Sequence, residues 1–162
     1  MIIILEDWEL EIDIPATMEW TGRHASEHCT CGYCENFYRT VDTAYPHMRP
    51  FLAQLGVNIE GPDEFCPFEP NICEATYVAT GRIIHRGKSV LFVDGVPIQI
   101  SDKLDMDHTL PKPCFGFIVG LMELPWVLDE PMEDVISPAN APECLDRMWK
   151  KLLQRSELTY EQ

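Results

Sequence analysis

The densest reactive chemistry of the chain lies in residues 28–37, which read HCTCGYCENF. Cys29, Cys31 and Cys34 lie within six positions there, and Gly32 allows the tight backbone turn of a metal knuckle. Thiolates are zinc ligands, and tetrahedral zinc accepts three sulfurs and a histidine. The spacing therefore predicts that the three cysteines converge to hold zinc. The alternative is three half-buried thiols at the start of a helix, because free cysteine is a commonly buried residue.

A zinc site with three cysteines needs a fourth ligand, for which the chain offers His24, His28, Cys66 and Cys73. No second Cys-x-x-Cys pair occurs, so spacing alone does not select one of them. We favour His24 or Cys73, because His28 directly precedes Cys29 and is expected to point away. The candidate metal ligands are therefore Cys29, Cys31, Cys34, His24 and Cys73.

The same residues have a redox interpretation. Cys31 and Cys34 with Gly-Tyr between them, ahead of a helix, resemble a glutaredoxin-type dithiol, in which the helix N-terminus lowers a thiol pKa. That framework needs a strand leading into the motif and a βαβ unit. Residues 23–28 are not strand-like, and the downstream pattern predicts antiparallel hairpins. We therefore expect no readily exchanging disulfide between the two cysteines, and keep a dithiol oxidoreductase as the alternative.

Other reactive residues form no recognisable motif. Asp102, Asp105, Asp107 and His108 lack the glycine and closing glutamate of a calcium loop, and predict a solvated loop. The chain has no Gly-x-Ser-x-Gly, no phosphate-binding glycine loop and no His-Glu-x-x-His. The sequence therefore assigns no catalytic residue.

Length and charge limit the classes of protein. The 162 residues fit a single domain, 1–162, with 46% hydrophobic residues. The net charge of −15 repels phosphate backbones and anionic lipids, so neither nucleic acid nor membrane is expected as a partner. A cationic protein fits better, although the charge also serves solubility. An odd count of 7 cysteines and an apolar N-terminus without a basic region predict a cytoplasmic protein. We expect it to be a monomer or a homodimer, between which the sequence does not choose.

The surrounding pattern predicts a sheet with helices. Residues 2–14 alternate as one strand or as a hairpin turning at Glu6-Asp7, and residues 16–28 are polar. A helical corner is expected over 33–56, with Pro50 in the first turn of its second helix and Gly56 just after that helix. Residues 57–72 predict an irregular segment.

Strands are expected at 73–84, 89–93, 96–100 and 115–124. Asp94-Gly95 predicts a hairpin that pairs Val93 with Val96, and Pro97 predicts an edge strand. Asn140 and Glu143 predict a capped C-terminal helix over 141–155. The fold class is α+β: an antiparallel sheet of about five strands, on which the helical corner (33–56) and the C-terminal helix (141–155) pack, with both sheet faces covered.

Two motifs together resemble a known group. Cys-x-Cys-x-x-Cys-x-Asn-Phe at 29–37 and Pro-Trp-Val-Leu-Asp-Glu-Pro at 125–131 are similar to runs in a group of short, uncharacterised bacterial proteins. The resemblance covers most of the chain and implies a small bacterial cytosolic protein with a recurring cysteine cluster. It implies no activity; size and acidity alone suggest an analogy with immunity proteins.

Two functional hypotheses follow from the sequence. The first is a small acidic binding protein, immunity-like or an adaptor, stabilised by a cysteine-cluster zinc site. The second is a thiol- or metal-dependent enzyme, such as a dithiol oxidoreductase, centred on Cys31 and Cys34. A closed site with four protein ligands would favour the binding protein. An exposed thiol with a shifted pKa in a concave pocket would favour the enzyme.

Overall fold

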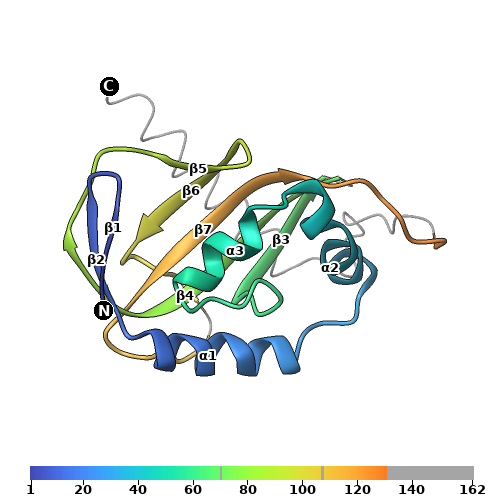
Figure 1. Ribbon diagram of the computed structural model, residues 1–162. Helices are drawn as coiled ribbons and strands as arrows, with labels where there is room; N and C mark the ends of the chain where they lie inside the picture. Colours follow the sequence, from blue (N-terminus) through green and yellow to red (C-terminus); the bar gives the residue numbers. More distant parts are fainter. Residues whose placement is uncertain (70, 107, 131–162) are drawn as a thin grey trace.

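The computed structural model describes residues 1–69, 71–106 and 108–130, which form an α+β fold around a seven-stranded sheet (Figure 1). The strand order is β1-β2-β4-β7-β6-β5, and β3 pairs with β4 beside this path. Every strand pair is antiparallel. The predicted class is confirmed, and the sheet has more strands than the five or so expected.

The N-terminal segment is a hairpin followed by a helix. β1 (Ile2–Leu5) and β2 (Trp8–Ile12) turn at Glu6-Asp7, as one of the two sequence interpretations predicted. Helix α1 (Ile14–Ser26) replaces the polar segment expected at 16–28. Asp13 caps this helix by accepting a hydrogen bond of 3.0 Å from the Ala16 backbone N–H.

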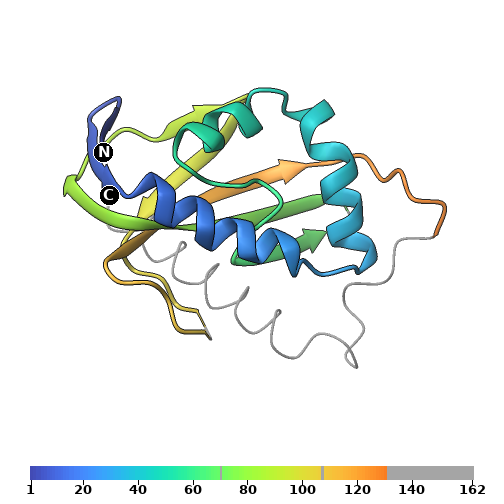
Figure 2. The same ribbon diagram turned by 60° about the horizontal axis from the view of Figure 1, so that its bottom comes forward.

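The helical corner is confirmed, and its helices are α2 (Gly32–Ala44) and α3 (Met48–Gln54). Gly56 follows α3 with a φ of +77°, and a Cβ there would lie 2.8 Å from the Ile14 carbonyl oxygen. Figure 2 shows α1, α2 and α3 on one side of the sheet. The buried apolar residues of α2 and α3 join the sheet in one core, which includes Phe37, Val41, Leu52, Tyr77 and Phe117.

Strand β4 (Ile72–His85) is the centre of the sheet and pairs with β2, β3 and β7. β3 (Glu64–Glu69) lies within the segment that was expected to be irregular. Its Pro67 suggested a break in regular structure, but β3 pairs on one side only, where a proline is tolerated. Side chains 73–79 are all buried, as expected for a strand covered on both faces.

The hairpin of β5 (Leu91–Val93) and β6 (Val96–Ser101) has the predicted Val93–Val96 register. The prediction that Pro97 marks an edge strand was wrong, because β6 also pairs with β7. The β6–β7 register starts at Ile98, so Pro97 lies outside it and its missing N–H disrupts no bond there.

β7 (Cys114–Glu123) confirms the last predicted strand. Strict alternation would place Leu121 on the same face as the buried Phe115, Phe117 and Val119, but it is 48% exposed and Met122 is buried instead. The β4–β7 register shifts between Cys73 and Ala75, which reverses the alternation beyond that point. The predicted C-terminal helix (141–155) lies outside the described residues. Among those that are described, no helix has the length and apolar character to cross a membrane.

Candidate functional site

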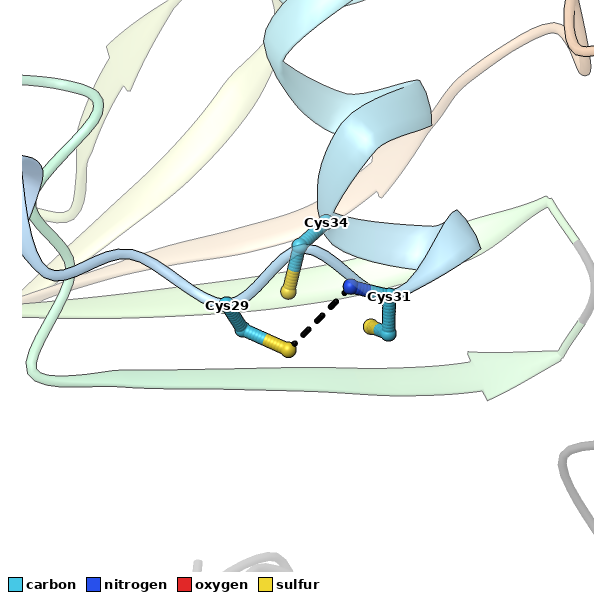
Figure 3. A group of neighbouring side chains, drawn as sticks. All are labelled: Cys29, Cys31 and Cys34. Atoms are coloured by element: carbon cyan, nitrogen blue, oxygen red, sulfur yellow. Dashed lines mark hydrogen bonds between the residues drawn. The ribbon is translucent and has the colours of Figure 1, made fainter.

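The three cysteines of the 29–37 motif meet at the start of α2. Their sulfur atoms all lie within 4.8 Å of one another, which confirms the predicted convergence, and we call them the cysteine triad. Cys31 is the N-cap of α2, and its backbone N–H lies 3.4 Å from the Cys29 sulfur. Figure 3 shows the three side chains around the first turn of the helix. Cys29 and Cys31 are exposed, whereas Cys34 is buried.

The pKa values of Cys31 and Cys34 in the triad are shifted in opposite directions. Hydrogen bonding from the Cys34 side chain, supported by the Cys34 backbone and the Cys29 side chain, lowers the pKa of Cys31 to about 5. The pKa of Cys34 is raised, because its thiol donates to Cys31, is buried and lies near two other sulfurs. Cys31 is therefore a thiolate at neutral pH, and Cys34 keeps its proton. Cys31 therefore combines the two properties of a reactive thiol, exposure to solvent and a low pKa.

The triad opens into a pocket of about 380 Å³. Its walls include the three cysteines, two aromatic residues from α2 and residues from the loop before β3. The pocket is also lined by Tyr33 and Tyr38 from α2, by His24 from α1 and by Asp63 from the loop before β3. Burial, followed by the nearby thiols, raises the pKa of Tyr38. A ligand of small-molecule size can reach the sulfurs from this pocket.

None of the candidate fourth ligands joins the three sulfurs in a single group of ligand atoms. Cys73 is buried in β4, where burial and then the Glu74 charge raise its pKa to about 12. Cys66 is buried in β3. The ring of His28 packs at 4.6 Å from that of Tyr38, and its Nδ1 lies 2.7 Å from the Ala25 carbonyl oxygen. His24 belongs to a separate group. Within the described ranges, the triad thus gathers three protein ligands and no fourth.

Residues 125–127 are hydrogen-bonded to α2, the helix at whose start the triad lies. The Asn36 Nδ2 donates to the Pro125 carbonyl oxygen at 3.0 Å, and the Val127 N–H donates to the Asn36 Oδ1 at 2.9 Å. The Trp126 ring lies 5.4 Å from that of Tyr33. The two motifs behind the sequence resemblance are therefore neighbours in space, over their described residues.

A second group of metal-ligating side chains escaped sequence reasoning. His24, Asp63 and His108 place one nitrogen or oxygen atom each within 4.8 Å of the others, and we call them the His–Asp–His cluster. They come from α1, the loop before β3 and the segment between β6 and β7. His108 had been assigned to a solvated loop, and Asp63 to an irregular segment. No local spacing joins three positions so far apart, so the sequence offered no signal for this cluster.

Gly61 determines how closely the loop that carries Asp63 packs against α1, the helix that carries His24. A Cβ at this position would lie 1.9 Å from the Thr21 carbonyl oxygen and 2.9 Å from the Ala25 backbone nitrogen, both in α1. The loop that carries Asp63 therefore rests directly on the helix that carries His24. Only glycine permits this contact without displacing backbone.

No known family model matches the chain, and no significant similarity to a curated protein or to a solved structure was found.

Proposed function

We propose that this chain is a metal-dependent thiolate protein, in which Cys29, Cys31 and Cys34 hold a zinc ion whose fourth coordination position opens into the pocket. One observation carries the proposal: three sulfurs within 4.8 Å of one another line a pocket of about 380 Å³. A tetrahedral zinc ion is held by three such ligands and has one position left for an exchangeable ligand.

Three protein ligands with an open position are typical of reactive zinc sites, whereas structural sites are closed by four. Two of the three cysteines are exposed, so a ligand from solvent can complete the coordination. The arrangement supports the thiol- or metal-dependent enzyme over the purely zinc-stabilised binding protein. At the open position zinc supplies Lewis acidity to a bound oxygen or sulfur atom, or lowers the pKa of bound water.

The test is the metal content of freshly purified, reduced protein. We expect about one zinc ion per chain, a fall in melting temperature after chelation, and a sulfur-to-metal charge-transfer band after cobalt substitution. Replacing Cys31 or Cys34 by serine should weaken the band, because one of three thiolate ligands is lost, and replacing all three cysteines should abolish it. Cys114→Ser is the matched control, because Cys114 lies in β7 outside the triad. Reduced protein that neither carries nor takes up zinc would contradict the proposal.

A second candidate uses the same thiols without metal. Cys31 is an exposed thiol whose pKa is lowered to about 5, and its hydrogen-bonding partner Cys34 is buried, which is the geometry of an attacking and a resolving cysteine. In this candidate a disulfide substrate oxidises the pair. The Cys31 thiolate attacks one substrate sulfur, which forms a mixed disulfide and expels the other as a thiolate; that thiolate takes up the proton that Cys34 loses. Cys34 then attacks the Cys31 sulfur, which forms the Cys31–Cys34 disulfide and releases the second substrate thiol. A helix, α1, precedes the motif where that class of enzyme has a strand.

One measurement separates the two candidates. A Cys31–Cys34 disulfide with a reduction potential of about −200 to −230 mV, together with exchange activity in metal-free protein, would favour the dithiol enzyme. Stable zinc and no exchange would favour the metal centre. The binding of a cationic protein stays a prediction that rests on the net charge of −15; its test is a complex that weakens as salt rises.

A further inference from the structure

We infer that the His–Asp–His cluster is a second metal site, separate from the cysteine triad, for a divalent transition metal that prefers nitrogen and oxygen donors. His24 and His108 would each bind through Nε2, and Asp63 through Oδ1. Two histidines and one carboxylate form a ligand set for Zn²⁺, Co²⁺ or Fe²⁺, with positions left for exogenous ligands.

The distances fit an ion better than direct hydrogen bonds. The Asp63 Oδ1 lies 3.5 Å from the His24 Nε2 and 3.4 Å from the His108 Nε2. A tetrahedral ion with bonds of about 2.0–2.2 Å separates its ligands by about 3.3–3.6 Å. Most N–H···O hydrogen bonds are shorter, at about 2.7–3.2 Å. Both nitrogen–oxygen separations therefore match edges of a coordination tetrahedron.

The hydrogen bonding of His24 leaves its Nε2 free for a metal. Its Nδ1 lies 3.0 Å from the Trp20 carbonyl oxygen, and since a carbonyl only accepts, Nδ1 must donate. In the neutral ring the lone pair is then on Nε2, which faces the Asp63 Oδ1, another acceptor. A cation between two acceptors that face each other, a metal ion or a proton, makes the contact attractive. Histidines that bind metal commonly donate their other N–H to a backbone carbonyl in this way.

Asp63 is held in place before any ion binds. Its side chain is 0% exposed, the Trp20 Nε1 donates to its Oδ1 at 2.8 Å, and the Val78 N–H donates to its Oδ2 at 2.8 Å. These bonds orient the carboxylate toward the two rings. The Trp20 ring also packs at 4.9 Å from the His24 ring and 6.3 Å from the His108 ring, so it supports both histidines and lies beside the site.

The two sites face one pocket. His24 and Asp63 line the pocket into which the triad opens, and His108 is 39% exposed, so an ion can enter. Sulfur donors select softer ions than imidazole and carboxylate do, which allows the two sites to be filled separately. The inference does not depend on zinc at the triad, because the two ligand sets share no residue.

The experiment isolates the second site by removing the first. A variant with Cys29, Cys31 and Cys34 all replaced by serine is titrated with Co²⁺, and circular dichroism checks that it folds. We expect one bound equivalent with ligand-field bands but no sulfur-to-metal charge-transfer band. We also expect quenching of the fluorescence of Trp20, which adjoins the site. In this background His108→Ala should weaken Co²⁺ binding by about 100-fold or more, because it removes a direct ligand.

Three matched variants make the result specific. His85→Ala tests an exposed histidine outside the cluster, and His28→Ala tests one in the same pocket; both should bind Co²⁺ like the background variant. Trp20→Phe should remove the quenching while Co²⁺ still binds. No Co²⁺ binding in the folded serine variant, or binding that His108→Ala leaves unchanged, would overturn the inference. The cluster would then be two histidine rings packed against a buried carboxylate, with no ion between them.

Discussion

The cysteine triad and the His–Asp–His cluster each bring three ligand atoms within 4.8 Å of one another. They differ in how far apart their residues lie in the sequence. The triad is local: its members lie within six residues and need only the first turn of α2. The cluster is assembled from positions 24, 63 and 108, and exists only after three distant segments pack. A local site needs little of the fold, whereas a site built at long range is part of what holds the fold together.

Burial shows the same difference. Two members of the triad are exposed, and the Cys31 thiolate points to an open pocket. In the cluster the central carboxylate is 0% exposed and satisfies a backbone donor of β4. Removing a triad cysteine should therefore affect chemistry, and removing Asp63 should affect folding first.

The largest effect is expected for Asp63→Ala. It leaves the Val78 N–H and the Trp20 indole N–H without their acceptor, at about 1–3 kcal/mol for each buried donor, so the free energy of unfolding should fall by roughly 2–6 kcal/mol. Denaturant unfolding measures the loss. In metal-free protein, Cys31→Ala and Asp105→Ala, at exposed positions, should cost less than about 1 kcal/mol. Equal losses in all three variants would erase the contrast between the two regions.

A substitution in either site should weaken metal binding at that site and leave metal binding at the other site unchanged. Zinc-site binding energies of about 10–16 kcal/mol, divided among the four ligands of a closed zinc site, correspond to about 100- to 1,000-fold per ligand. Cys31→Ser should therefore weaken Cd²⁺ binding at the triad by that factor and leave Co²⁺ binding at the cluster unchanged, and His108→Ala should do the reverse. Calorimetric titrations with the two ions measure both. A variant that weakens both ions alike would show that the two groups form a single site.

A smaller effect is expected for Gly61→Ala. The added methyl group meets backbone atoms of α1, so the helix and the loop must separate, at about 1–3 kcal/mol of stability. Because this moves His24 away from Asp63, Co²⁺ binding at the cluster should weaken while triad binding persists. Gly22→Ala is the matched control, since nothing lies within 4 Å of its Cβ. Gly61→Ala protein that melts and binds Co²⁺ like the wild type would refute the close packing.

The smallest effect concerns pH and belongs to the triad alone. In metal-free protein, alkylation of Cys31 should stay fast at neutral pH and slow as pH falls through about 5, because the thiolate is protonated there. Cys34→Ala removes the hydrogen bond that lowers this pKa most, so the midpoint should move upward toward the ordinary 9.0. Cys34→Ser, which keeps a donor, should shift it less. A wild-type midpoint near that ordinary value would contradict the hydrogen-bonded thiolate.

What the sequence predicted correctly depends on short-range physics. The Asp94-Gly95 turn fixes the Val93–Val96 register, because both central residues must tolerate positive φ. The triad converges for a similar reason, since its spacing fits one helix start. The fold class and the helical corner were also predicted from a short-range pattern, the periodic spacing of apolar residues along the chain.

Helix α1 was missed because its buried stripe is polar. Thr17 and Thr21 are both 0% exposed, and their hydroxyls donate to the carbonyl oxygens of Asp13 and Thr17, one turn earlier. A stripe of threonine carries no apolar period. Strand β3 was hidden by Pro67, and the His–Asp–His cluster by the distance between its members. In each case a tertiary contact, and not a local preference, decides the outcome.

The two hydrogen bonds of Asn36 have a consequence for biosynthesis. The residues they join are separated by 89 and 91 positions, so a chain growing from its N-terminus makes the triad long before the segment that packs beside it. During that interval α2 lacks the Asn36 contacts, and the Trp126 ring has not yet reached Tyr33. The nascent chain therefore presents its thiols to cellular metal and oxidants before this part of their surroundings has been synthesised.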